Sequence, residues 1–130
     1  MRLLLDTCAL LWFLRDDDEL SETAAAAIEK TDNEVFVSVV SIWEIAIKAS
    51  LGKIKAPVGL EKGLEQKLTE AGFTLLDVSY RHAAGVYSLP KVHTDPFDRL
   101  LISQCRAEKL IAVTSDAHWS AAGYGVRVLW

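Results

Sequence analysis

Short apolar runs alternate along this chain with longer segments whose apolar positions recur every three or four residues. The runs are predicted strands, at residues 3–5, 35–37, 73–78, 110–113 and 126–129. The segments are predicted helices, over about residues 8–14, 21–30, 41–50, 81–88 and 95–109, with a further one inside 57–72. Because strands and helices alternate, we expect an α/β fold with a parallel sheet of four or five strands covered by helices on both faces.

Two of the predicted helices begin with clear capping signals. Ser41 followed by Glu44 spells a capping box. Asp95 is a good N-cap, Pro96 suits the first helical position, and Asp98 then falls in the first turn. Acids at such positions are common because they favour the positive end of the helix dipole, so each signal also has a purely structural explanation.

Composition narrows the class of protein. A chain of 130 residues with 51% hydrophobic and 25% charged residues is expected to form one globular domain, residues 1–130. A net charge of −4 argues against nucleic-acid binding by bulk charge but leaves room for a local basic patch. The two cysteines have no metal-binding spacing, so we expect free thiols and a cytoplasmic protein. No stretch approaches the ~18 apolar residues of a membrane span, so we expect no membrane segment.

Four acids follow or flank the predicted strands. Asp6 and Asp116 come after strands, Glu44 lies in the helix after the second strand, and Asp98 starts the helix before the fourth. The carboxyl ends of parallel strands share one edge of the sheet, which is where α/β proteins bind ligands. Four carboxylates gathered there would repel one another unless a cation is present, and an all-oxygen site favours Mg²⁺, with Mn²⁺ as an alternative.

Each acid also has a structural explanation when taken alone. Asp6 and Asp116 could be N-caps, Glu44 could complete a capping box with Ser41, and Asp98 could stabilise the helix dipole. The joint arrangement of the four acids is what favours a metal site.

The motifs around these acids resemble those of PIN-domain ribonucleases, and in particular of VapC-type toxins from type II toxin–antitoxin systems. The resemblance extends over nearly the whole chain and rests on Leu4-Leu5-Asp6-Thr7, Ser41-Ile42-Trp43-Glu44-Ile45 with Lys48, Gly52-Lys53-Ile54, Leu89-Pro90, His93-Thr94-Asp95-Pro96-Phe97-Asp98-Arg99 and Thr114-Ser115-Asp116. Asp-Pro-Phe-Asp-Arg is the most specific of these motifs. The chain departs from close relatives at Cys8, where histidine is usual, and at Thr94, where a basic residue is common.

The resemblance implies a function and a set of roles. Asp6, Glu44, Asp98 and Asp116 would hold Mg²⁺, with Asp6 and Asp98 as the direct ligands. The expected activity is metal-dependent endoribonuclease cleavage of RNA, often a structured RNA such as tRNA. The expected partners are a cognate antitoxin, which docks over the active site, and a second copy of the chain in a homodimer.

Other side chains and other functions stay open at this point. Lys48, His93 and Arg99 are candidate substrate contacts, although a structural role for His93 or an ion pair for Arg99 is an alternative. A catalytically degenerate domain that only binds RNA or a partner is one other function. An aspartyl-phosphate phosphatase with Asp6 as nucleophile is less favoured, because such enzymes need an acid two residues later, where this chain has Cys8.

Overall fold

A five-stranded parallel sheet forms the centre of the protein. The computed structural model describes residues 1–130, and its strands are β1 (Arg2–Leu5), β2 (Glu34–Ser38), β3 (Thr74–Leu76), β4 (Ile111–Val113) and β5 (Val128–Leu129). Their order across the sheet is β3-β2-β1-β4-β5, and every neighbouring pair is parallel. The predicted α/β class and parallel sheet are therefore confirmed.

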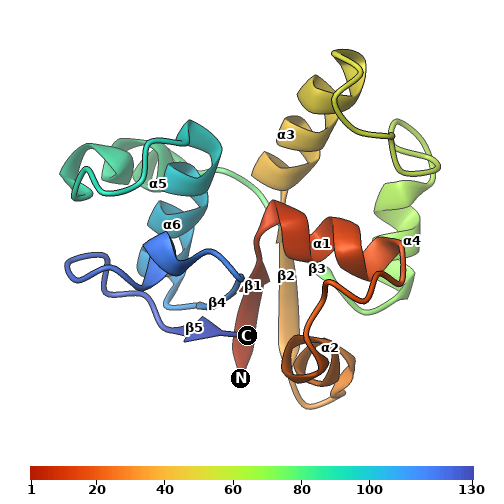
Figure 1. Ribbon diagram of the computed structural model, residues 1–130, viewed down its shortest axis with the longest axis horizontal. Coiled ribbons are helices and arrows are strands. Elements are labelled where there is room, and N and C mark those ends of the chain that lie inside the picture. Colours follow the sequence, from red (N-terminus) through yellow and green to blue (C-terminus); the bar gives the residue numbers. More distant parts are fainter.

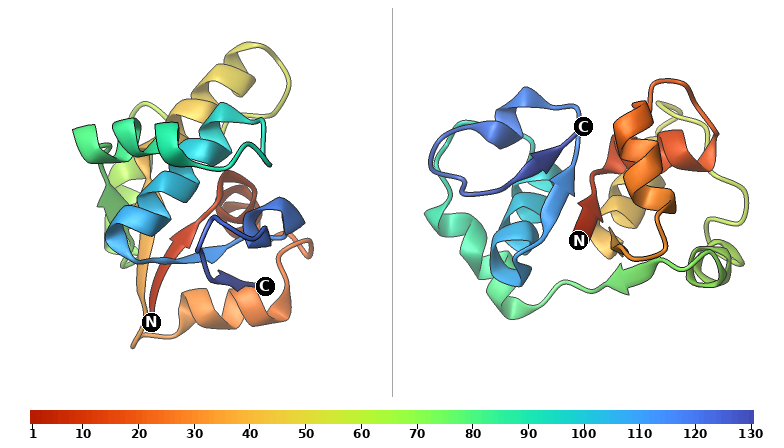
Figure 2. Two further views of the ribbon diagram at one scale, coloured as in Figure 1. Left: turned by 90° about the vertical axis from the view of Figure 1, so that its left-hand side faces the viewer. Right: turned by 90° about the horizontal axis from the view of Figure 1, so that it is seen from below.

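Helices join the strands and lie on both sides of the sheet (Figures 1 and 2). They are α1 (Thr7–Leu14), α2 (Glu22–Glu29), α3 (Val39–Ser50), α4 (Leu64–Glu70), α5 (Tyr80–Gly85) and α6 (Pro96–Glu108), with short 3₁₀ helices η1 (Val86–Ser88) and η2 (Ala117–Ser120). Seen from below, α1 and α2 lie on one side of the strands and α5 and α6 on the other (Figure 2). No helix of the structure combines the length and the apolar character that crossing a bilayer requires.

The alternation of side chains along the strands builds a hydrophobic core on each face. Leu4 pairs in register with Phe36 and Ala112, and all three pack in the core that α6 covers. Leu3 and Leu5 point to the opposite face and pack with residues of α1, α2 and α4. Strands that are buried on both faces explain why the sequence shows continuous apolar runs instead of alternating ones.

One helix start differs from the predictions. The predicted capping box of Ser41 and Glu44 is wrong, because β2 runs directly into α3 and Ser38 is the N-cap, accepting the N–H of Val40 at 3.0 Å. The helix predicted inside residues 57–72 is confirmed as α4, which begins at Leu64 after Gly63, a residue with a left-handed φ of 96°.

The order of the strands reverses direction at the centre of the sheet, between β1 and β4. From β1 the chain moves outward through β2 to β3, then returns on the other side of β1 to form β4 and β5. At such a reversal the connections leave the neighbouring strands β1 and β4 in opposite directions, and ligands of α/β proteins bind beyond the carboxyl ends of those strands. Asp6 follows β1 and Asp116 lies just beyond β4, so the fold places both at this point.

Candidate functional site

Asp6 is the buried acid of the candidate site. It is 5% exposed and serves as the N-cap of α1, accepting the N–H of Ala9 at 2.7 Å. Its second oxygen accepts the hydroxyl of Thr114 at 2.5 Å, so the end of β4 fixes the carboxylate that follows β1. The predicted structural role as a cap is confirmed, and it leaves the carboxylate at the carboxyl edge of the sheet.

Glu44 reaches the same edge from α3. Because Ser38 caps the helix, the Glu44 carboxylate does not take part in capping. It instead accepts a hydrogen bond from the Thr7 hydroxyl at 2.6 Å. The Thr7 hydroxyl also contacts that of Ser41 at 3.0 Å. On its other oxygen Glu44 forms an ion pair with Lys48, one turn further along α3. These contacts tie α1 to α3 beside Asp6.

Asp98 lies in the first turn of α6. The predicted start of this helix is confirmed, with Asp95 as N-cap and Pro96 as the first helical residue. Asp95 accepts the N–H groups of Phe97 and Asp98, at 2.8 and 3.4 Å, so the helix does not use the Asp98 carboxylate. That carboxylate is 19% exposed and lies 2.9 Å from Nε2 of His93.

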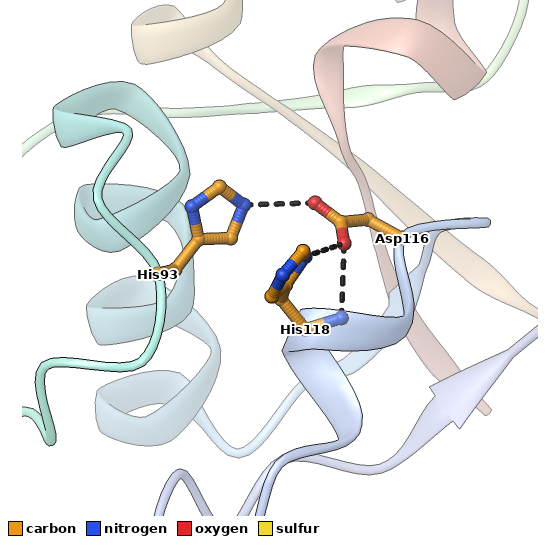
Figure 3. A group of neighbouring side chains, drawn as sticks. All are labelled: His93, Asp116 and His118. Atoms are coloured by element: carbon orange, nitrogen blue, oxygen red, sulfur yellow. Dashed lines mark hydrogen bonds and ion pairs between the residues drawn. The ribbon is translucent and has the colours of Figure 1, made fainter.

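His93 joins two of the acids. Its Nε2 lies 2.8 Å from Asp116 (Figure 3). The same nitrogen lies 2.9 Å from Asp98. The N–H of Asp95 donates to its Nδ1 at 3.2 Å, which makes Nε2 the nitrogen that carries a proton. The other oxygen of Asp116 accepts from the N–H of His118 and lies 2.7 Å from its Nδ1 (Figure 3). An N–H between two carboxylates offsets part of their repulsion.

The pKa values record how closely the acids lie. Burial raises the pKa of Asp6 to about 6, and the charges of Asp116 and Glu44 add to this increase. Burial also raises the pKa of Asp98 to about 7, with further contributions from the charges of Asp95, Asp6 and Glu44, against the opposing charge of His93. The charges of the four predicted acids therefore act on one another: Asp116 and Glu44 raise the pKa of Asp6, and Asp6 and Glu44 raise the pKa of Asp98.

Asp116 differs from the other acids in its surroundings. Burial acts to raise its pKa, but hydrogen bonds from His118 and His93 outweigh burial and lower it. Its carboxylate is therefore the one most readily held as an anion without a metal.

This donor set suits a divalent cation. Carboxylate oxygens are the ligands preferred by Mg²⁺ and Mn²⁺, and a cation would remove the repulsion that raises the pKa values of Asp6 and Asp98. His93, Asp116 and His118 offer a second group of ligand atoms within 4.8 Å of one another. Imidazole nitrogens in that group add donors that suit transition metals more than Mg²⁺.

The remaining predicted residues have different surroundings. Lys48 pairs with Glu44, and this hydrogen bond raises the pKa of the Lys48 ammonium group. Arg99 donates to four backbone carbonyls, those of Val86, Leu89, Pro90 and His93. Its guanidinium therefore holds the loop that presents His93, and a substrate contact through Arg99 stays a prediction. Cys8 is exposed as a residue, but its thiol is partly buried. This partial burial, together with the charge of Asp6, raises the pKa of the thiol to about 11.

Sequence reasoning did not identify three groups that shape the site. The hydroxyls of Thr7 and Thr114 each donate to one of the acids, and His118 contacts Asp116. Thr114 directly follows β4, Thr7 comes next after Asp6 as the first residue of α1, and His118 is two residues after Asp116 in η2. Their closeness in sequence to Asp6 and Asp116 was the one signal that could have indicated their contacts with the acids.

Comparisons with known proteins agree with this fold. Residues 3–123 match the model of the PIN domain family. No curated protein matches the sequence. Among solved structures, the chain is similar to VapBC2 from Rickettsia felis bound to a promoter DNA fragment, with 16% identity and a TM-score of 0.72 over 98% of this chain and 97% of that one.

Two further solved structures have the same fold. DNA-bound VapBC from Salmonella typhimurium is 15% identical, with a TM-score of 0.69 over 98% of this chain and 96% of that one. FitAcB from Neisseria gonorrhoeae is 20% identical, with a TM-score of 0.67 over 97% of this chain and 95% of that one.

Proposed function

Because this chain belongs to the PIN domain family, we propose that it is a metal-dependent endoribonuclease that acts as the toxin of a toxin–antitoxin pair. The observation that carries the proposal is that Thr114 contacts both Asp6 and Asp116, while His93 contacts both Asp98 and Asp116, with Glu44 held by Thr7 beside Asp6. Like charges are costly to collect in a partly buried place, and a cation-dependent reaction on a phosphodiester explains why this fold collects them.

The four acids have distinct parts in the proposed site. Asp6 and Asp98, whose pKa values are raised by burial, would hold Mg²⁺ or Mn²⁺ directly. Glu44 accepts a hydrogen bond from Thr7, and Asp116 accepts one from the N–H of His118, so these two acids would contact the cation through water. When bound, the cation supplies Lewis-acid chemistry, which acidifies water and offsets charge on a phosphodiester.

Other side chains of the site orient the acids and meet the substrate. Thr114 holds Asp6, and Thr7 holds Glu44, in fixed orientations. Lys48 and His93 lie at the edge of the acid group, where a cationic or N–H donor can contact a phosphate oxygen of the RNA backbone. Arg99 positions His93 through the loop carbonyls.

The toxin role is inferred from the solved structures of similar fold. Two of them are named VapBC and a third is described as a toxin–antitoxin complex from Klebsiella pneumoniae. By analogy we propose that a protein antitoxin binds this chain, that the chain pairs with a second copy, and that its substrate is RNA, with structured RNA such as tRNA as the first to test.

The test of the activity is RNA cleavage by the wild type and two aspartate variants. With Mg²⁺ the wild type should cleave, EDTA should stop it, and Asp98→Asn should lower the rate by at least roughly 100-fold, since it removes a direct metal ligand. Asp32→Asn is the matched control, because Asp32 is exposed in the turn before β2, at the opposite edge of the sheet. Cleavage that persists in EDTA, or in Asp98→Asn, contradicts the proposal.

A further inference from the structure

An exposed tryptophan lies beside the acids of the candidate site. Trp43 is 58% exposed, although indole is among the largest apolar groups in the chain. In sequence it directly precedes Glu44 on α3. A single exposed apolar side chain is ordinary in itself, so the neighbours of this ring are what point to a role.

A second aromatic ring fixes the position of this indole. The rings of Trp43 and Phe97 are 5.1 Å apart between centroids and meet edge to face at 75°. Phe97 directly precedes Asp98 on α6 and packs against the core beneath that helix. The pair therefore spans α3 and α6, the two helices that carry Glu44 and Asp98, whose first turns lie at the same edge of the fold (Figure 1).

An edge-to-face pair leaves the indole ordered, with much of its surface open. A ring held in this way loses little conformational entropy when a planar group stacks on it. Lys48, on the same helix and paired with Glu44, supplies a positive charge nearby. Proteins that bind single-stranded nucleic acid combine these two elements, an aromatic surface for bases and cations along the backbone.

On these grounds we propose that Trp43, held by Phe97, is the stacking surface for an unpaired base of the RNA next to the phosphodiester that is cut. This inference rests on the proposed function, and it names Trp43 as a positioning residue for single-stranded substrate. A base stacked on Trp43 fixes the strand beside Glu44 and Asp98, so the flanking phosphate enters the acid group in one register.

The groove on the other side of Trp43 suits RNA less well. Trp43 also lines a mainly apolar groove of 280 Å³ between α3 and α4, with Leu60, Leu64 and Leu68. Glu61 and Glu65 line the same groove, and their carboxylates would repel phosphates. The RNA backbone is therefore expected on the α6 side of the indole, away from Glu61 and Glu65.

The test measures RNA binding with cleavage switched off. In the Asp98→Asn background with Mg²⁺, a short unstructured RNA is titrated against proteins with and without Trp43→Ala. Loss of one stacked base should weaken binding roughly 5- to 150-fold. Trp43→Phe should keep most of the affinity, and Tyr80→Ala is the matched control, because Tyr80 is 90% exposed on α5, a helix that provides no acid.

Two further readouts separate stacking from a general structural effect. An abasic oligomer of the same length and charge should bind the Trp43→Ala protein and its parent equally well. RNA should quench tryptophan fluorescence in the parent, and Trp43→Phe should lose that quenching while Trp12, Trp119 and Trp130 still emit.

The outcomes distinguish this inference from the proposed function. If the wild type cleaves RNA but Trp43→Ala changes neither affinity nor quenching, the stacking role is wrong. Equal weakening for intact and abasic oligomers likewise overturns stacking. If the wild type neither binds nor cleaves RNA, the proposed function fails, and the stacking role fails with it.

Discussion

At the scale of single residues, two threonines set the state of the acids. Thr114 donates to Asp6 and also accepts the N–H of Asp116 at 3.0 Å, so one hydroxyl links the acids that follow β1 and β4. Its hydrogen bond is the largest effect lowering the pKa of Asp6 against burial. A hydroxyl without formal charge thus decides how readily a buried carboxylate ionises.

We expect Thr114→Val to raise the pKa of Asp6 above about 6, because the substitution removes the hydrogen bond that most strongly lowers this pKa against burial. Mg²⁺ binding needs the carboxylate ionised, so the pH at which binding is half-maximal should move upward. Calorimetric titration with Mg²⁺ across pH measures this, and Thr114→Ser, which keeps the hydroxyl, should behave as the wild type. An unchanged pH midpoint in Thr114→Val would contradict the assigned role.

The residue-scale predictions from sequence were right where the signal was local. Asp95, Pro96 and Asp98 are a complete helix start within four residues, and the structure has that start. The signal at Ser41 and Glu44 was equally local but wrong, because Ser38, at the end of β2, had already capped α3. The partners of Arg99 could not be predicted, because backbone carbonyls carry no sequence signature.

At the scale of elements, the loop from Val86 to Asp95 is held by side chains from elsewhere. Arg99 donates to four of its carbonyls, and the hydroxyl of Tyr124 accepts the N–H of His93 at 2.7 Å. The loop has no regular structure of its own after η1. These contacts are what present His93 to Asp98 and Asp116.

Replacing Arg99 by leucine should therefore loosen the loop and destabilise the protein. Several partly buried carbonyls would lose their donor, at a cost of about 1–3 kcal/mol in the free energy of unfolding. Urea unfolding measures the change. Arg106→Leu, at an exposed arginine of the same helix without a side-chain hydrogen bond, is the control and should change stability far less. Equal stability of the two variants would argue against the loop contacts.

A buried polar chain connects β2 to α6. The hydroxyl of Ser38, which caps α3, donates to the side-chain oxygen of Gln104 at 2.6 Å. The amide nitrogen of Gln104 donates to the carbonyl of Asp77 at 3.2 Å and lies 3.4 Å from Nδ1 of His82. One side chain of α6 thus fixes the start of the helix that carries Glu44.

We expect Gln104→Leu to lower the free energy of unfolding by about 1–3 kcal/mol, because it leaves the Ser38 hydroxyl buried without an acceptor. Adding Ser38→Ala should then cost less than Ser38→Ala does alone, since the unpaired group is removed. Chemical unfolding of both single variants and the double variant tests this. Strictly additive losses would mean that the two side chains are not coupled.

At the scale of the whole molecule, the acids oppose the stability of the fold. Asp6 and Asp98 have raised pKa values, about 6 and about 7, so the folded protein keeps protons that the unfolded chain releases above about pH 4. Stability without metal should therefore fall as pH rises from about 4 to about 7. Asp116 and Glu108, whose pKa values are lowered, act in the opposite direction and cost stability only below about pH 4.

Thermal unfolding in EDTA should show this slope directly. We expect the Tm to be at least roughly 3 °C lower at pH 8 than at pH 5, a difference worth about 1 kcal/mol in a chain of this size. Millimolar Mg²⁺ should raise the Tm at pH 8 and have little effect at pH 5, where Asp6 and Asp98 hold protons. Asp98→Asn should flatten the slope in EDTA. A Tm that rises with pH would contradict the raised pKa values of Asp6 and Asp98.

The architecture was predictable because its signals are distributed along the chain. Continuous apolar runs mark the strands Arg2–Leu5, Glu34–Ser38 and Ile111–Val113, which are buried on both faces. The meeting of Asp6 and Asp116 followed from the rule that ligands bind at the carboxyl ends of parallel strands. The exact length of an element such as α4 did not follow, since Gly59 and Gly63 in left-handed conformations delay its start.

The pairing of β1 with β4 has a consequence for how the protein is made. Asp6 is synthesised 108 residues before Thr114, which orients it, and both Thr114 and Asp116 emerge only after α6. A nascent chain on the ribosome that ends before β4 lacks both, whatever else has folded. The order of synthesis therefore delays assembly of the acid group until β4 and the residues that follow it have been made.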